Sequence, residues 1–110
     1  MSRRAPRVDG NQAAIVRALR AAGCSVTLLH GVGDGCPDLL VGARGRTVLL
    51  EVKRSEAAAA SHVDSGPRQA RWRSCWRGGP ILVVWSPETA LAAVGVVPPS
   101  QESGPPAVRG

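Results

Sequence analysis

The chain has 110 residues, which is enough for one domain with a single hydrophobic core and little to spare. Its net charge of +6 favours a polyanionic partner, with nucleic acid ahead of an anionic membrane surface. No apolar run approaches the roughly 20 residues that cross a bilayer, and no signal peptide is expected. Three cysteines without the spacing of a disulfide framework or a zinc site favour a reducing, cytoplasmic location.

The predicted elements are typical of a small mixed α/β domain. A basic flexible arm over 1–10, a folded domain over 11–95 and a Pro-, Gly- and Ser-rich disordered tail over 96–110 are expected. Within the domain we predict a helix over 11–22, a strand over 24–29, a hairpin over 38–53, a helix over 67–76, a strand over 80–85 and a short helix ending near 94. This order indicates a small mixed β-sheet flanked by helices.

Local signals mark where the helices begin and end. Asp9 or Asn11 is expected to cap the first helix. Ser86 is expected to cap the last helix, with Pro87 at its first position. The segment 54–66 has a run of alanines but no helical period, so a loop is predicted there.

Two patterns predict where apolar surface is buried. Trp72 and Trp76 are four residues apart on one helix, so they should face together into the core or into a dimer interface. The apolar run over 80–85 predicts a strand that is buried on both faces, and Trp85 at its end is a further candidate dimer contact.

The hairpin carries a group of residues that suits chemistry on an anion. If its strands pair through the turn 43–46, Asp38 at the start of one strand lies beside Glu51 and Lys53 at the end of the other. Glu51 and Lys53, two residues apart, share one face of the strand, while Val52 turns into the core. Two carboxylates and an ammonium at one edge are a plausible site for a divalent metal and an anionic substrate.

The distribution of basic residues supports a special role for Lys53. Thirteen of the fourteen basic residues are arginine, and the single lysine falls two positions after Glu51. A compact ammonium can approach a water or phosphate oxygen in a way that a planar guanidinium cannot.

The glycine-rich stretch Gly31-Val32-Gly33-Asp34-Gly35 does not indicate a nucleotide cofactor. Dinucleotide and phosphate loops of this kind lead into a helix, whereas a strand follows here. The stretch is either a flexible loop that lets a DNA backbone approach the site or an ordinary turn, and Asp34 is interpreted as a turn residue.

A predicted strand pair separates two motifs, Gly35-x-Pro37-Asp38 before it and Glu51-Val52-Lys53 after it. This arrangement resembles the PD-(D/E)XK nuclease superfamily. The closest likeness is to small phage and archaeal Holliday-junction resolvases and stand-alone VRR-NUC domains. The likeness covers roughly Asp9 to Val94 and implies a restriction-endonuclease-like fold. It also implies that Asp38 and Glu51 bind Mg²⁺, or Mn²⁺ as a substitute, together with the Val52 carbonyl. Lys53 would orient or help to deprotonate the attacking water.

The resemblance extends less firmly to two glutamines. Gln12 stands where many resolvases carry a glutamate in the first helix, and Asp9 lies one turn earlier. The identity of the fourth site residue therefore stays open, and Gln12 is either a site residue or an exposed helix residue. Gln69 resembles a glutamine that follows the lysine motif in VRR-NUC proteins and lies near their metal site. Phosphate contacts are expected from Arg44, Arg46, Arg54, Arg68, Arg71 and Arg73.

The expected function is a metal-dependent, structure-selective DNA endonuclease in the cytoplasm of a bacterium or a phage-infected cell. A homodimeric Holliday-junction resolvase making paired, symmetric nicks is the leading hypothesis, because a C2 dimer matches the near two-fold symmetry of a junction. Two alternatives stay open: a nuclease of the same fold acting on flaps, single strands or duplex, and a DNA-binding protein without catalytic activity.

Overall fold

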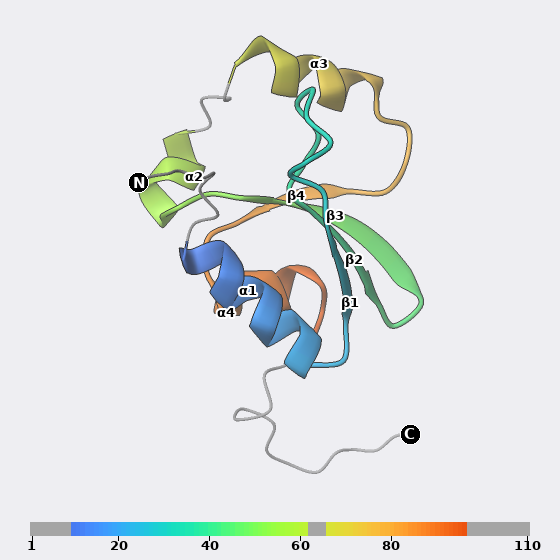
Figure 1. The fold of residues 1–110 in the computed structure, drawn as a ribbon, viewed down its shortest axis with the longest axis vertical. Helices are drawn as coiled ribbons and strands as arrows, with labels where there is room; N and C mark the ends of the chain where they lie inside the picture. Colours follow the sequence, from blue (N-terminus) through green and yellow to red (C-terminus); the bar gives the residue numbers. More distant parts are fainter. Residues whose placement is uncertain (1–9, 62–65, 97–110) are drawn as a thin grey trace.

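The computed structural model describes residues 10–61 and 66–96, which fold around one four-stranded sheet (Figure 1). The elements are α1 (Gly10–Ala21), β1 (Ser25–Leu28), β2 (Leu39–Ala43), β3 (Arg46–Val52), α2 (Glu56–Ser61), α3 (Pro67–Cys75), β4 (Ile81–Val84) and α4 (Pro87–Ala93). The predicted mixed sheet flanked by helices is confirmed. Of the predicted arm and tail, residues 1–9 and 97–110 lie outside the described residues, and Gly10 already belongs to α1.

The strands lie in the order β1-β2-β3-β4. The pairs β1–β2 and β2–β3 are antiparallel, and the pair β3–β4 is parallel. One face of this sheet packs against α1 and α4, which lie together on the same side (Figure 1). The largest fully buried side chains come from these layers and include Ile15, Leu19, Leu39, Val41, Leu50, Val84 and Val94. Among the described helices, none is long and apolar enough to cross a membrane.

The hairpin forms in the predicted register. Leu39 pairs with Leu50 and Ala43 with Arg46, so the turn has Arg44 and Gly45 at its centre. Both central residues have positive φ, 54° and 81°, as a two-residue turn requires if it is to follow the twist of the strands. Alternation along β3 then places Val48, Leu50 and Val52 against the α1/α4 core, and the residues between them on the opposite face.

The prediction that Asn11 caps α1 was wrong, and Asp9 lies outside the described residues. Asn11 is the second residue of the helix. Its Nδ2 donates hydrogen bonds to the carbonyl oxygens of Lys53 (2.7 Å) and Trp85 (3.4 Å), whereas a cap must accept a bond from a backbone N–H. Asn11 therefore ties the start of α1 to the residues that follow β3 and β4.

The loop predicted over 54–66 contains a short helix, α2, which is a correction. Ser55 caps it, since the N–H of Ala58 donates to Ser55 Oγ at 3.0 Å. Alanine has the highest helix propensity, so the run forms a helix without an apolar face. None of its residues is buried, which explains why no period marks it in the sequence.

The apolar surfaces of α3 and β4 are less buried than predicted. No residue of α3 is buried, and Trp76, which follows it, is 38% exposed, so the core placement of the tryptophans was wrong. In β4 only Val84 is buried. The continuous apolar run suggested an interior strand, but β4 pairs with β3 alone and forms an edge of the sheet.

The start of α4 agrees with the prediction. The N–H of Thr89 donates to Ser86 Oγ at 3.0 Å, and Thr89 Oγ1 accepts in turn from the N–H of Ser86 at 2.9 Å. Pro87 occupies the first helical position, where a missing N–H leaves no hydrogen bond unmade.

The loop between β1 and β2 rises from the sheet to α3 (Figure 1). At Gly35, where φ is +83°, a Cβ atom would overlap the carbonyl group of Arg68 and lie 2.8 Å from the N–H nitrogen of Gln69. Only glycine allows this approach, because it has no Cβ and tolerates positive φ. The contact positions the first turn of α3 relative to the strand ends.

Gly35→Ala is expected to destabilise the fold and to displace α3, because the added methyl group cannot share space with the Arg68 carbonyl. Gly33→Ala is the matched control, since Gly33 has a similar φ of +79° and open space around its Cβ position. The control should show only the left-handed backbone cost, about 1–2 kcal/mol in urea unfolding. Equal destabilisation of the two variants would contradict a positioning role for the Gly35 contact.

Candidate active site

The end of β3 lies beside the start of β2, and this pairing brings two carboxylates together. Asp38 directly precedes the Leu39–Leu50 pair, and its N–H donates to the Leu50 carbonyl at 3.0 Å, so Asp38 lies beside the end of β3 that carries Glu51. The N–H of Val52 donates to Asp38 Oδ2 at 2.8 Å. The Asp38 carboxylate is therefore held directly by the backbone of the strand that carries Glu51.

Glu51 lies on the sheet face opposite the α1/α4 core, yet it is only 6% exposed. Burial raises the pKa of the Glu51 carboxyl, and the negative charge of Asp38 raises it further. The hydrogen bond from Gln69 and the positive charges of Lys53 and Arg73 act in the opposite direction but do not reverse the shift. Two carboxylates thus share a poorly solvated site, in which the charge of Asp38 disfavours the ionised form of Glu51.

Lys53 shares the face of Glu51, as the strand period predicts. Its Nζ lies 3.9 Å from Glu51 Oε2. The backbone of Lys53 is fixed on both sides, because its N–H donates to the Val84 carbonyl at 2.9 Å and its own carbonyl accepts from Asn11. The ammonium is therefore placed beside the carboxylates by the strand end itself.

Helix α3 supplies two further groups to this site. Gln69 Nε2 donates to Glu51 Oε2 at 2.9 Å, which agrees with the predicted position of Gln69 near the carboxylates. Arg73, one helical turn later, is close enough for its charge to lower the pKa of Glu51. This face of α3 therefore belongs to the site, although Gln69 is 18 residues from Glu51 in the sequence.

Gln12 is buried in the stripe of α1 that also contains Ile15, Val16 and Leu19, with 7% of its surface exposed. Within the described part of the chain, its Nε2 atom has no hydrogen-bond partner. The neighbouring Asn11 contacts the Lys53 carbonyl, so this end of α1 lies at the strand ends that carry the site. The exposed-helix alternative for Gln12 is therefore wrong.

The predicted phosphate-binding arginines divide into two groups. Arg54 follows β3 directly after Lys53, and Arg68, Arg71 and Arg73 lie on α3. Arg44 and Arg46 lie at the hairpin turn, the opposite end of β3 from Glu51. The five steps along the strand from Arg46 to Glu51 span about 17 Å at roughly 3.3 Å per residue, so the structure does not bring these two arginines to the carboxylates.

Cys36 and Asn11 contribute to the surroundings of the site, a role not predicted for either residue from the sequence. Burial raises the pKa of the Cys36 thiol, followed by the negative charges of Asp38 and Glu51, so the sulfur lies near both carboxylates. Its position two residues before Asp38 was the available signal, because alternate residues of an extended segment share a side. Nothing in the sequence indicated that Asn11 would reach the strand ends 42 and 74 residues away.

The chemistry of the donors fits a hard divalent cation. No group of three or more His, Cys, Asp or Glu side chains suited to a metal occurs among the described residues. Mg²⁺ keeps several water ligands and needs only one or two carboxylates, whereas a structural zinc site needs four protein ligands. Asp38 and Glu51 are such a pair, and the unfavourable charge between them is what a cation would relieve.

Glu51→Gln is expected to make the protein more stable at pH 7 than the wild type. The raised pKa means that folded chains bind the Glu51 proton more tightly than unfolded chains do, so ionisation destabilises the fold. The stability that tighter proton binding adds to the wild type is lost as pH rises from the ordinary pKa of 4.5 through the raised pKa of Glu51. The advantage of the variant should therefore shrink as pH falls through the raised value towards 4.5, and should be absent below 4.5.

Urea unfolding of both proteins across this pH range measures the effect. Glu88→Gln, at an exposed position in α4, is the control and should give no such pH-dependent gain. A Glu51→Gln gain of the same size at every pH would contradict the assignment of the effect to ionisation.

Comparison with known proteins identifies the family. No protein-family model matches the sequence, and no curated protein matches it. A solved structure described as a VRR_NUC domain is 30% identical in sequence, with a TM-score of 0.56. The match covers 74% of this chain and 89% of that one. The shared fold and sequence identity agree with the Pro37-Asp38 and Glu51-Val52-Lys53 motifs, and the chain therefore belongs to the VRR-NUC family of the PD-(D/E)XK nuclease superfamily.

Proposed function

We propose that this chain is a metal-dependent DNA endonuclease that selects its substrates by structure and acts on four-way junctions. The observation that carries the proposal is the group formed by Asp38, Glu51 and Lys53 at one end of the hairpin. The carboxylates are close enough for one charge to raise the pKa of the other, and the ammonium lies 3.9 Å from Glu51 Oε2. Hydrolysis of an anionic phosphodiester gains most from such a combination of a cation site and an ammonium.

Each residue has a separate part in the proposed mechanism. Asp38 and Glu51, with the Val52 carbonyl, would hold Mg²⁺ or Mn²⁺, which when bound lowers the pKa of water and neutralises developing charge. Lys53 would orient the attacking water or, as the neutral amine, help to deprotonate it. In its ammonium form it would stabilise negative charge on the phosphate. Gln69 holds the Glu51 carboxylate in place through its hydrogen bond. The products would carry 5′-phosphates.

DNA recognition would depend on the phosphate backbone and on shape. The basic side chains near the site come from Arg54 and from α3. Contacts between such side chains and phosphates position the protein on DNA without reading the base sequence. The net charge of +6 supports the same conclusion.

A homodimer is part of the proposal, because paired nicks in a junction require two equivalent sites. Strand β1 is an edge of the sheet. Leu28 at its end and Val32 in the loop beyond are 40% and 62% exposed. An open strand edge with adjacent exposed apolar side chains is a suitable surface for a second copy.

Nicking of a synthetic four-way junction tests the assignment. The wild type with Mg²⁺ should give symmetric paired nicks that EDTA abolishes, and Asp38→Asn should cut at least about 100-fold more slowly. Lys53→Arg should lower the rate by roughly 10²–10⁴-fold, because a guanidinium stays protonated and cannot replace the lysine amine in proton transfer. Glu88→Gln is the control and should cut like the wild type.

The other outcomes separate the alternatives. Cleavage of a flap, single strand or linear duplex of the same sequence, with the junction bound but uncut, would keep the site and replace the substrate. Junction binding without cleavage of any DNA in Mg²⁺ or Mn²⁺ would contradict the enzyme proposal and favour a DNA-binding protein.

Gln12→Leu separates a functional role of Gln12 from a structural one. The unpartnered buried amide destabilises the fold by about 1–3 kcal/mol relative to a satisfied group, so an apolar residue of similar size should raise stability. If Gln12 serves the site, the same variant should lower junction cleavage. Urea unfolding and nicking of one preparation measure both effects. A more stable variant with unchanged cleavage would remove Gln12 from the proposed site.

A further inference from the structure

Two tryptophans near the site are not used by the hydrophobic core. Trp72 lies on α3, which has no buried residue, and Trp76 directly follows it. Their rings stack on each other with centroids 5.0 Å apart and an interplanar angle of 20°. Large aromatic rings kept at the surface by a helix without core contacts are typical of a binding site.

Trp76, one ring of the stacked pair, is held in place by its neighbours in the chain. Trp76 Nε1 donates to the Gly79 carbonyl at 2.7 Å. The ring of Trp76 lies against Gly78 so closely that a Cβ at that position would overlap it. A platform held in this way loses little conformational freedom when a flat ligand stacks on it.

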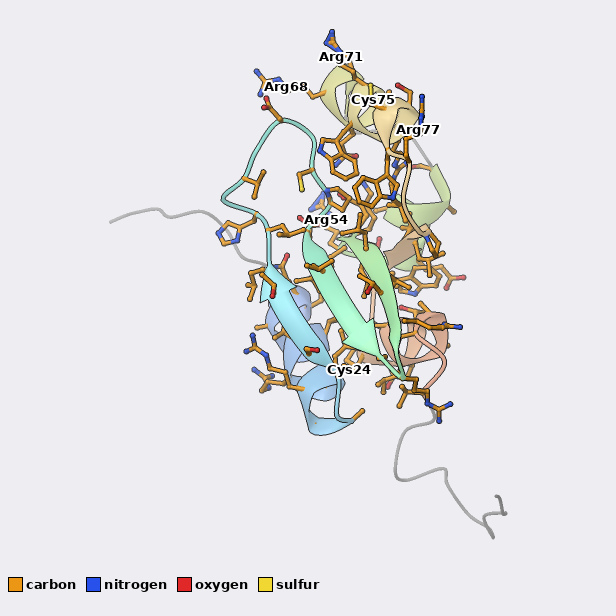
Figure 2. All side chains as sticks on the ribbon, turned by 90° about the vertical axis from the view of Figure 1, so that its right-hand side faces the viewer. Cys24, Arg54, Arg68, Arg71, Cys75 and Arg77 are labelled. Atoms are coloured by element: carbon orange, nitrogen blue, oxygen red, sulfur yellow. The ribbon has the colours of Figure 1, made fainter. Side chains whose placement is uncertain are left out.

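The two rings form part of a groove of about 540 Å³, which we call the α3 groove. It is lined by Asp34, Arg68, Arg71, Trp72, Cys75 and Trp76. Figure 2 shows Arg68, Arg71 and Cys75 on α3, with Arg71 directed away from the sheet. A planar aromatic surface beside two guanidinium groups suits a ligand that combines a flat ring with negative charge.

The α3 groove lies next to the catalytic group, because α3 contributes to both. Gln69 donates to Glu51, while Trp72 stands three residues further along the same helix. Three residues correspond to about 4.5 Å along a helix axis. A DNA strand whose phosphate reaches Glu51 would therefore pass the groove with a neighbouring nucleotide.

We propose that the α3 groove binds an unpaired nucleobase of the DNA substrate, stacked on the Trp72–Trp76 pair. Arg68 and Arg71 contact the flanking phosphates, and Asp34 accepts a hydrogen bond from an amino group on the base edge. The inference rests on the proposed function and deepens it. The preferred substrate would expose an unpaired base beside the cleavage position, as at a junction branch point that has partly opened.

Binding without cleavage tests the groove directly. In EDTA, fluorescence anisotropy compares a short single strand, the same strand with its bases removed, and the fully paired duplex. The wild type should prefer the intact strand over the abasic strand by roughly tenfold or more. Trp72→Ala and Trp76→Ala should abolish this preference.

The arginine variants separate charge from stacking. Arg71→Gln should weaken binding of the intact and abasic strands equally, because it removes a phosphate contact. Arg17→Gln, at an exposed position on α1, removes the same charge elsewhere and should leave the preference and most of the affinity unchanged.

Cys75 provides a test that needs no substitution. Its thiol is exposed and lines the groove, whereas Cys24 is buried. The intact strand should slow maleimide modification of Cys75, measured by mass spectrometry of its peptide, and the abasic strand should not.

Three results would overturn the inference. The first is equal wild-type affinity for the intact and abasic strands. The second is a rate of maleimide modification of Cys75 that DNA does not change. The third is that the Trp variants alter the oligomeric state but not the base preference. The last result would assign the tryptophans to contact between copies of the chain. Because the binding measurements are made in EDTA, they are independent of cleavage. A base preference without cleavage in Mg²⁺ would reject only the nuclease proposal. Cleavage without a base preference would reject only the proposal that the α3 groove binds a base.

Discussion

The pairing of β2 with β3 is the constraint on which the site depends. The N–H of Asp38 reaches the Leu50 carbonyl, and the N–H of Val52 reaches the Asp38 carboxylate. Because side chains alternate along a strand, a slip of one residue would turn Glu51 into the core and Leu50 out of it. The burial of Val48 and Leu50 against α1 and α4 therefore fixes the register, and with it the distance between the carboxylates. Core packing and the geometry of the site are one constraint in this small domain.

The site also contains charged and polar groups whose burial is unfavourable for the folded state. Glu51 is a buried carboxylate beside a second carboxylate, and only part of the unfavourable interaction is relieved by Gln69, Lys53 and Arg73. Gln12 adds a buried amide without a hydrogen bond for its Nε2 in the described chain. Unfavourable groups of this kind concentrate at functional sites, where activity rather than stability has determined the residues.

The parts of the structure that the sequence predicted are those set by local rules. A strand period of two placed Glu51 and Lys53 on one face, and a two-residue turn aligned Asp38 with them. The Ser86–Pro87 start of α4 follows from capping chemistry. The predictions that were wrong have a different origin. Helix α2 has no apolar face to reveal it. The apolar residues of α3 and β4 suggested interior positions, but α3 has no buried residue and β4 is an edge of the sheet. Long-range contacts of Asn11 leave no local pattern.

Helix α3 is attached to the domain differently from α1 and α4. It contributes no buried residue, and the described contacts that locate it are the Gln69–Glu51 hydrogen bond and the close approach of Gly35 to the Arg68 backbone. Separation of α3 from the sheet would therefore expose little apolar surface and would require far less free energy than unfolding the core. We therefore expect the two halves of the site to belong to different cooperative units. Asp38, Glu51 and Lys53 would persist as long as the sheet does, whereas Gln69 and the tryptophan pair would leave and return together. Entry and release of a bulky branched polymer can use this difference without any opening of the core.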